Sequence, residues 1–136
     1  MNAVQHIAMN CRDIKAQEAF YTKHFGFRRA RVFNHGTPGE FVMLRLGSMC
    51  IELFKNPNAG SATGAEQAIG FRHLAFEVKD IEKSVATLQN DGVKVGNVID
   101  CSSIEPGLRV CFFQDPEGNW LELMEGWKDQ AKPPKA

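Results

Sequence analysis

The sequence predicts an α+β fold made of two tandem β-α-β-β-β modules. The first observation is an internal repeat, in which residues 6–14 align with residues 73–81 at a constant offset of 67 and His, Ala, Asp and Ile recur. The second observation is that a helix-like stretch, a glycine and three strand-like runs follow each copy. We therefore expect a pseudo-two-fold arrangement, a curved mixed sheet whose two halves surround one cavity.

Both helices carry recognisable end signals. Asp13 and Asp80 stand where an N-cap belongs, and Gly26 and Gly92 stand where a left-handed residue ends a helix. The second helix has a buried stripe at helical spacing, formed by Ile81, Ser84, Val85 and Leu88. The first helix has a less regular stripe, formed by Ile14, Ala16, Ala19 and Phe20.

The remaining elements are strands rich in Phe, Val, Ile and Leu, joined by hairpin turns. The turn signals are Asn34–Gly39, Gly47–Ser48 and Asp115–Gly118. A module of about 60 residues is marginal as an independent core, so we expect one domain rather than two. This domain spans residues 1–126, with module one at 3–55, a linker at 56–70, module two at 71–126 and a polar tail at 127–136.

Composition narrows the function classes. The 136 residues include 16 Lys and Arg against 16 Asp and Glu, which gives no basic surplus for a nucleic-acid partner. No apolar stretch reaches the roughly 20 residues of a membrane span, and the N-terminus has no signal-peptide pattern. We therefore expect a cytoplasmic protein with no nucleic-acid or membrane partner. The four cysteines form no CxxC pair and are expected to be reduced.

Four polar residues lie on otherwise apolar strands. Because side chains alternate along a strand, His6 and Glu52 of module one, and His73 and Glu122 of module two, are each predicted to point away from the helix-packed face. Any one of them alone would be read as a solvated surface residue. Their recurrence in both modules favours a divalent metal held in the shared cavity, and nitrogen and carboxylate ligands suit Ni, Co or Zn, with Mn or Fe as further possibilities.

The chain also resembles a known family. The segments His6–Met9, Ala19–Phe27 and Asp115–Leu123 are similar to those of the vicinal oxygen chelate superfamily, and of glyoxalase I in particular. The resemblance covers residues 3 to 126 and implies metal ligation by His6, Glu52, His73 and Glu122.

The resemblance also implies a reaction. It indicates a lactoylglutathione lyase-like metalloenzyme in which Glu122 acts as the base and Glu52 as a ligand or second proton carrier. The implied substrate is a small molecule, such as the glutathione hemithioacetal of methylglyoxal, and Asn56 is a candidate substrate contact, with Arg109 as a second. The family commonly forms homodimers. The loop at Glu105–Gly107 replaces a Lys-Gly-Gly-type loop of glyoxalase I, which leaves glutathione itself open.

Other functions stay open beside this one. An epimerase or an extradiol-type dioxygenase would keep the metal and change the reaction. A metal-free resistance protein that binds a drug would have the same fold, but four convergent polar groups are costly in a pocket without a metal.

Overall fold

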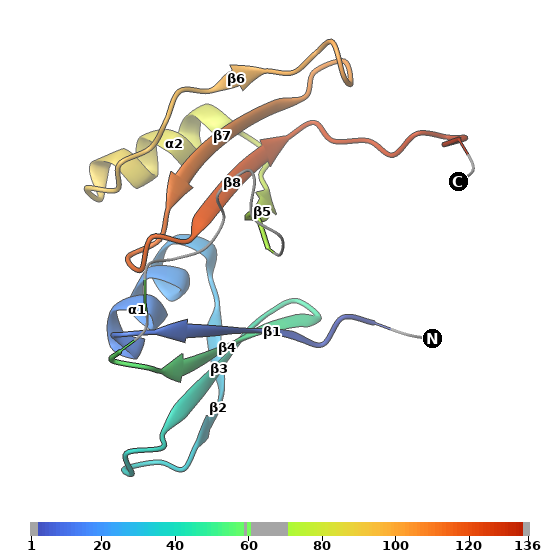
Figure 1. Ribbon diagram of the computed structural model, residues 1–136. Helices are drawn as coiled ribbons and strands as arrows, with labels where there is room; N and C mark the ends of the chain where they lie inside the picture. The colour runs from blue at the N-terminus through green and yellow to red at the C-terminus, as the bar shows by residue number, and fades with distance from the viewer. Residues whose placement is uncertain (1–2, 59, 61–70, 135–136) are drawn as a thin grey trace. The chain divides into compact units, whose positions relative to one another are not determined.

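The computed structural model describes residues 3–58, 60 and 71–134, which form two compact units (Figure 1). Unit 1 is Met1–Ala62 with Asp115–Asn119, and unit 2 is Thr63–Gln114 with Trp120–Ala136. Residues 59 and 61–70 of the predicted linker, and 135–136 of the predicted tail, lie outside the described residues. The rest of the tail, residues 127–134, forms no helix or strand.

Unit 1 contains one mixed sheet and one helix, which confirms the predicted module. Its elements are β1 (His6–Cys11), α1 (Ile14–Phe25), β2 (Arg28–Phe33), β3 (Phe41–Leu46) and β4 (Met49–Lys55). The strand order is β1-β4-β3-β2, with β1 parallel to β4 and the other pairs antiparallel. The first and last strands of the module are therefore neighbours.

Unit 2 repeats this topology. Its elements are β5 (Leu74–Glu77), α2 (Ile81–Asn90), β6 (Ile99–Asp100), β7 (Arg109–Gln114) and β8 (Trp120–Glu125). The strand order is β5-β8-β7-β6, and β5 runs parallel to β8. In this unit β6 is much shorter than its counterpart β2. An isolated bridge from Val95 to Phe113 adds to the pairing at β7.

Local end signals position both helices as predicted. The Asp13 carboxylate accepts a hydrogen bond from the N–H of Ala16, and Asp80 accepts one from the N–H of Lys83. Gly26 has a φ of 71° and Gly92 a φ of 80°, both in the left-handed region that glycine tolerates best. The predicted hairpin turns also lie between the strands that they were expected to join.

The buried face of α1 differs from the prediction. Phe20 is buried as predicted, but Ala16 and Ala19 are exposed, and the helix buries Gln17 and Tyr21 in their place. Hydrophobic periodicity does not predict this face because Gln17 is polar. Its buried side-chain nitrogen donates a hydrogen bond to the carboxylate of Asp115.

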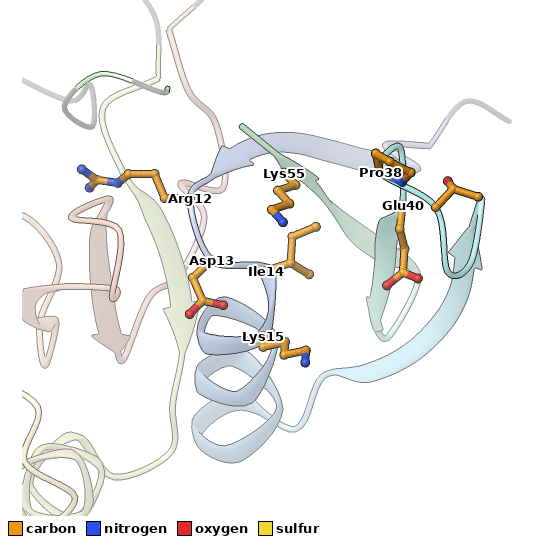
Figure 2. A pocket seen from close by; sticks show the side chains of 8 residues that line it. Arg12, Asp13, Ile14, Lys15, Pro38, Glu40 and Lys55 are labelled. Atoms are coloured by element: carbon orange, nitrogen blue, oxygen red, sulfur yellow. The ribbon is translucent and has the colours of Figure 1, made fainter. Parts of the chain in front are cut away.

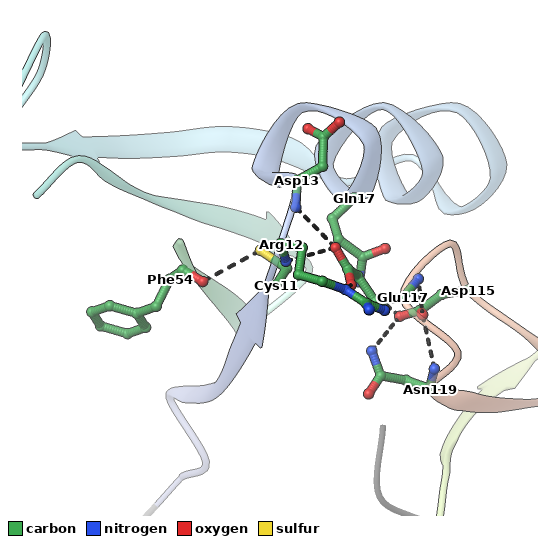
Figure 3. A network of polar contacts seen from close by, with 8 residues as sticks. All are labelled: Cys11, Arg12, Asp13, Gln17, Phe54, Asp115, Glu117 and Asn119. Atoms are coloured by element: carbon green, nitrogen blue, oxygen red, sulfur yellow. Dashed lines mark hydrogen bonds and ion pairs between the residues drawn. The ribbon is translucent and has the colours of Figure 1, made fainter. Parts of the chain in front are cut away.

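Asp115 lies in the turn that joins β7 to β8, and that turn belongs to unit 1 (Figure 3). Only 5% of the residue is exposed. One carboxylate oxygen accepts hydrogen bonds from Gln17 Nε2 at 2.8 Å, Tyr21 OH at 2.9 Å and Asn119 Nδ2 at 2.8 Å. The other accepts from the backbone N–H groups of Glu117 and Asn119. These five donors compensate the cost of burying the charge.

Glu117 of the same turn binds the start of α1 (Figure 3). Its carboxylate accepts from the backbone N–H groups of Arg12 at 2.7 Å and Asp13 at 2.9 Å, and from Arg12 Nε at 3.0 Å. Burial acts to raise the pKa of Glu117, but these hydrogen bonds and the Arg12 charge outweigh it. The pKa of Glu117 therefore lies below its ordinary value of 4.5.

The cysteines are free, as expected, and three of the four are buried. Burial raises the pKa of the Cys11 thiol to about 11 and also raises the pKa of Cys111, so neither forms a thiolate readily near neutral pH. Among the described residues, no helix is both long enough and apolar enough to cross a membrane.

We predict that Asp115→Ala destabilises the protein by about 3 kcal/mol, because it leaves the buried donors of Gln17 and Tyr21 without an acceptor. Tyr21→Phe should cost about 1 kcal/mol, since it removes one donor from the same carboxylate. Urea denaturation measures both values. The surface variant Asp129→Ala is the control, and an Asp115→Ala protein as stable as this control would contradict the role of the network.

A second prediction concerns acid. A carboxylate whose pKa is lowered by folding stabilises the protein at pH values above its unfolded pKa, and this contribution is lost as pH falls through the folded pKa. The stability advantage of the wild type over Glu117→Gln should therefore be full at neutral pH and shrink below about pH 4.5. Denaturation at several pH values tests this, and a difference independent of pH would refute it.

Candidate metal centre

In unit 1 the parallel pairing of β1 with β4 brings His6 and Glu52 together. The register places His6 beside Cys50 and Ala8 beside Glu52, so these residues share one face of the sheet. His6 Nε2 lies 3.6 Å from Glu52 Oε2. The His6 side chain is 42% exposed and that of Glu52 only 13%, which leaves the imidazole accessible beside a largely buried carboxylate.

Unit 2 contains the equivalent pair. His73 directly precedes β5, and the register places Ala75 beside Glu122. His73 Nε2 lies 2.8 Å from Glu122 Oε2, with side chains 30% and 6% exposed. The ring of Phe112, which pairs with Glu122 across β7 and β8, meets the His73 ring edge-on at 5.4 Å between centroids. Glu122 is thus buried, and its imidazole partner is packed against an aromatic ring.

In each unit the helix packs on the sheet face opposite the His–Glu pair. In unit 1 the buried apolar residues Val42, Leu44, Ile51 and Leu53 lie on the sheet face opposite Glu52, and α1 contacts β3 and β4. In unit 2 the buried residues Cys111, Phe113, Leu121 and Leu123 lie on the face opposite Glu122, and α2 contacts β7 and β8. Each His–Glu pair therefore lies on the sheet face that its helix does not cover, as predicted.

The sequence prediction overlooked an aromatic ladder on the Glu52 face. Phe33, Phe41 and Phe54 occupy paired positions on β2, β3 and β4, and their rings stack at 4.3 Å and 4.5 Å between centroids. The Arg31 guanidinium lies 5.1 Å from the centre of the Phe33 ring. Phe54 follows Glu52 by two residues, so strand alternation could have placed it on this face, but the stacking depends on the strand register.

The predicted substrate contacts occupy different environments. Asn56 follows β4, and its N–H donates to the Cys11 carbonyl at 2.8 Å, which extends the β1 and β4 pairing beyond Glu52. Arg109 pairs with Glu125 across β7 and β8, so it lies on the face opposite Glu122. Its guanidinium contacts the Glu82 carboxylate of α2. Asn56 therefore continues the β1 and β4 pairing four residues beyond Glu52, whereas Arg109 lies on the face opposite Glu122.

Within each unit the donor set fits a divalent metal. Two ligand atoms bound at roughly 2.0–2.2 Å to one ion lie about 3 Å apart when they subtend a right angle. The separations of 3.6 Å and 2.8 Å bracket this value. We find no larger ligand group among the described residues of either unit, where no three His, Cys, Asp or Glu side chains are grouped as they would be around a metal ion. Each unit supplies one pair.

A separate cavity of about 400 Å³ lies in unit 1 beside the start of α1 (Figure 2). Its lining comprises Arg12, Asp13, Ile14, Lys15, Thr37, Pro38, Glu40 and Lys55. None of the predicted site residues lines it. Several of its charged groups already have structural partners: Asp13 caps α1, Arg12 binds Glu117, and Glu40 accepts from His35 and Gly36. The His–Glu pairs are therefore the stronger candidate site.

Solved structures with low sequence identity share this fold. A lactoylglutathione lyase from Agrobacterium tumefaciens is 23% identical with a TM-score of 0.66, over 93% of this chain and 95% of that chain. The fosfomycin resistance protein FosX from Listeria monocytogenes is 15% identical with a TM-score of 0.74, over 93% and 95% of the two chains. At these identities the likeness establishes the fold alone.

More similar proteins cover nearly the whole chain. The uncharacterised protein YaeR of Escherichia coli (strain K12) is 35% identical over 92% of this chain and 97% of its own, and YwkD of Bacillus subtilis (strain 168) is 33% identical over 92% and 98%. A glyoxalase family protein from Enterococcus faecalis has a TM-score of 0.76 at 31% identity, over 90% and 97% of the chains. Residues 3–123 match the model of a protein family described as the Glyoxalase/Bleomycin resistance protein/Dioxygenase superfamily. The chain belongs to the Glyoxalase/Bleomycin resistance protein/Dioxygenase superfamily.

Proposed function

We propose that the protein is a metal-dependent isomerase or lyase of the glyoxalase I type. In this proposal one divalent ion is bound by His6, Glu52, His73 and Glu122, and the reaction moves a proton between neighbouring carbons of an α-hydroxy carbonyl compound. The observation that carries the proposal is the repetition of the His–Glu pair in each unit, on the face that the helix leaves uncovered.

The family supports this assignment in its coarse form. Members bind small molecules and typically a divalent metal, and they are often dimers, so we also propose a homodimer. Ni, Co or Zn suits two imidazoles and two carboxylates best, and Mn or Fe can use the same ligands. When bound, such an ion supplies Lewis acidity toward the substrate oxygens.

Glu122 is the proposed base. Its side chain is 6% exposed, so a proton that it accepts is sheltered from exchange with bulk water. His73 Nε2 lies 2.8 Å from the carboxylate, so both groups are close enough to be ligands of one ion. Glu52 is the proposed partner ligand or second proton carrier, and its exposure of 13% gives it a similarly sheltered position. General acid–base catalysis by one positioned carboxylate contributes about 10²- to 10⁴-fold to a rate.

The proposed substrate class is a glutathione hemithioacetal, such as that of methylglyoxal. Asn56 is the proposed substrate contact because it follows β4 directly beyond Glu52 and Phe54. Arg109 is left out, since Glu82 engages it on the opposite face. Acyl-CoA thioesters would test the epimerase alternative, and catechols with oxygen uptake would test the dioxygenase alternative.

The third alternative is a metal-free binding protein, and an antibiotic binding protein has the same fold. This protein, from Streptomyces sp. CB03234, is 22% identical with a TM-score of 0.68, over 92% of this chain and 96% of that chain. A metal-free binding protein would need no buried carboxylate beside each imidazole. The two pairs therefore favour the metalloenzyme.

We predict that the purified wild type binds a divalent metal through both pairs. His6→Ala and His73→Ala should each weaken metal affinity at least 10-fold, because each removes a ligand. His35→Ala is a matched control, since His35 also contacts a carboxylate, that of Glu40 at 2.8 Å, but on an exposed loop. Elemental analysis and chelator competition measure the affinity. Equal metal binding by all three variants would refute the site.

Glu122→Gln tests the catalytic role separately. It should lower turnover of the hemithioacetal by about 10²- to 10⁴-fold in protein that still contains metal. Normal turnover by metal-loaded Glu122→Gln would remove Glu122 from the role of base. If the wild type binds metal and acts only on a thioester or a catechol, the substrate assignment fails while the metal site stands.

A further inference from the structure

We propose that Gln5 is a positioning residue that selects the metal-binding nitrogen of His6. In this inference the Gln5 amide fixes the imidazole in the tautomer that carries its proton on Nδ1, so that the lone pair lies on Nε2. The inference rests on the proposed function, because it assigns Gln5 a task at the same site.

The backbone of Gln5 is held by β4. Its carbonyl oxygen accepts a hydrogen bond from the N–H of Cys50 at 2.8 Å, which extends the parallel pairing by one position before His6. Cys50 is fully buried and lies beside His6 in the register. The starting point of the Gln5 side chain is therefore fixed relative to the imidazole.

The side chain bridges two neighbours. Gln5 Nε2 faces the sulfur of Cys50 at 3.9 Å, and Gln5 Oε1 contacts His6 Nδ1. A thiol sulfur is a weak acceptor, so it suits the N–H end of the amide, and the carbonyl end is left for the imidazole. Contacts at both ends give the amide a defined orientation.

The donor and acceptor roles then determine the tautomer. An amide oxygen can only accept, so the His6 nitrogen that contacts it must carry the proton. In a neutral imidazole the other nitrogen, Nε2, then holds the lone pair. Nε2 is also the atom that lies 3.6 Å from Glu52 Oε2, on the side where the proposed metal would bind. Metal-binding histidines commonly donate their second N–H in this way, which orients the ring and raises its basicity.

Module two has no such residue at the equivalent position. The repeat offset places Arg72 where Gln5 stands in module one. A guanidinium has five donors and no acceptor, so Arg72 cannot receive an N–H from His73. The Gln5 side chain is therefore not matched by an acceptor side chain at the aligned position of module two.

The test compares Gln5→Met with Gln5→Glu in the full chain. Met is similar in length but offers only a weak acceptor, whereas Glu keeps a carboxylate oxygen for Nδ1. Gln5 is exposed, so neither change should disturb the core. The first readout is ¹⁵N NMR of the His6 ring in metal-free protein at a pH where the imidazole is neutral, with His6→Ala identifying the signals. The second is zinc affinity by chelator competition.

We expect the wild type and Gln5→Glu to show the proton on Nδ1, and Gln5→Met to show a mixture of tautomers. Zinc affinity should fall about 10-fold in Gln5→Met and be preserved in Gln5→Glu. If Gln5→Met keeps both the wild-type tautomer and the wild-type zinc affinity, the inference is overturned. This holds even if His6→Ala binds zinc weakly, which would only show that His6 is a ligand. Unchanged zinc binding by His6→Ala would instead overturn the proposed metal site, and the NMR result would still decide whether Gln5 sets the tautomer.

Discussion

The parallel pairing of the first and last strands of each module determines which side chains share a sheet face. In unit 1 it aligns Ala8 with Glu52, and in unit 2 it aligns Ala75 with Glu122, which brings each carboxylate to the histidine two residues before the alanine. A register slip of one residue would move the carboxylate to the helix-packed face, where it would meet the buried apolar core. Burial of that core therefore fixes the position of the site residues.

Two buried carboxylates of this protein illustrate different uses of the same group. Asp115 accepts five hydrogen bonds on two oxygens that have about four lone-pair sites, so no site is left for another partner, which suits it to a structural role. Glu122 is as deeply buried but lies against an imidazole nitrogen at 2.8 Å. An imidazole and a carboxylate held together are a ligand pair for a metal, whereas an amide, a phenol and backbone N–H groups are not.

Much of the fold could be predicted from the sequence because its signals are local. The N-cap aspartates, the glycines that end the helices and the repeated motifs each act within a few residues, and the structure confirms them. The buried face of α1 could not be predicted in this way. Gln17 is buried by a carboxylate 98 positions further along the chain, and a contact of that range leaves no periodic signal.

In the candidate site, too, local patterns could be predicted from the sequence, whereas features that depend on distant contacts could not. Strand alternation was enough to predict that His6, Glu52, His73 and Glu122 lie opposite the helix-packed faces. The face of Arg109 depends on the antiparallel register of β7 with β8, which the sequence does not specify. The Gln5 contact depends on the packing of Cys50, and a glutamine before a strand has no signature of its own.

The proposed function requires that both His–Glu pairs bind the same ion. X-ray absorption spectroscopy at the metal edge of the loaded wild type counts the imidazole ligands directly. Two imidazoles per metal in the wild type, and one in either His6→Ala or His73→Ala, is the result that a shared site predicts. A single imidazole per metal in the wild type, with two metals per chain, would show that each pair binds its own ion and would contradict the claim.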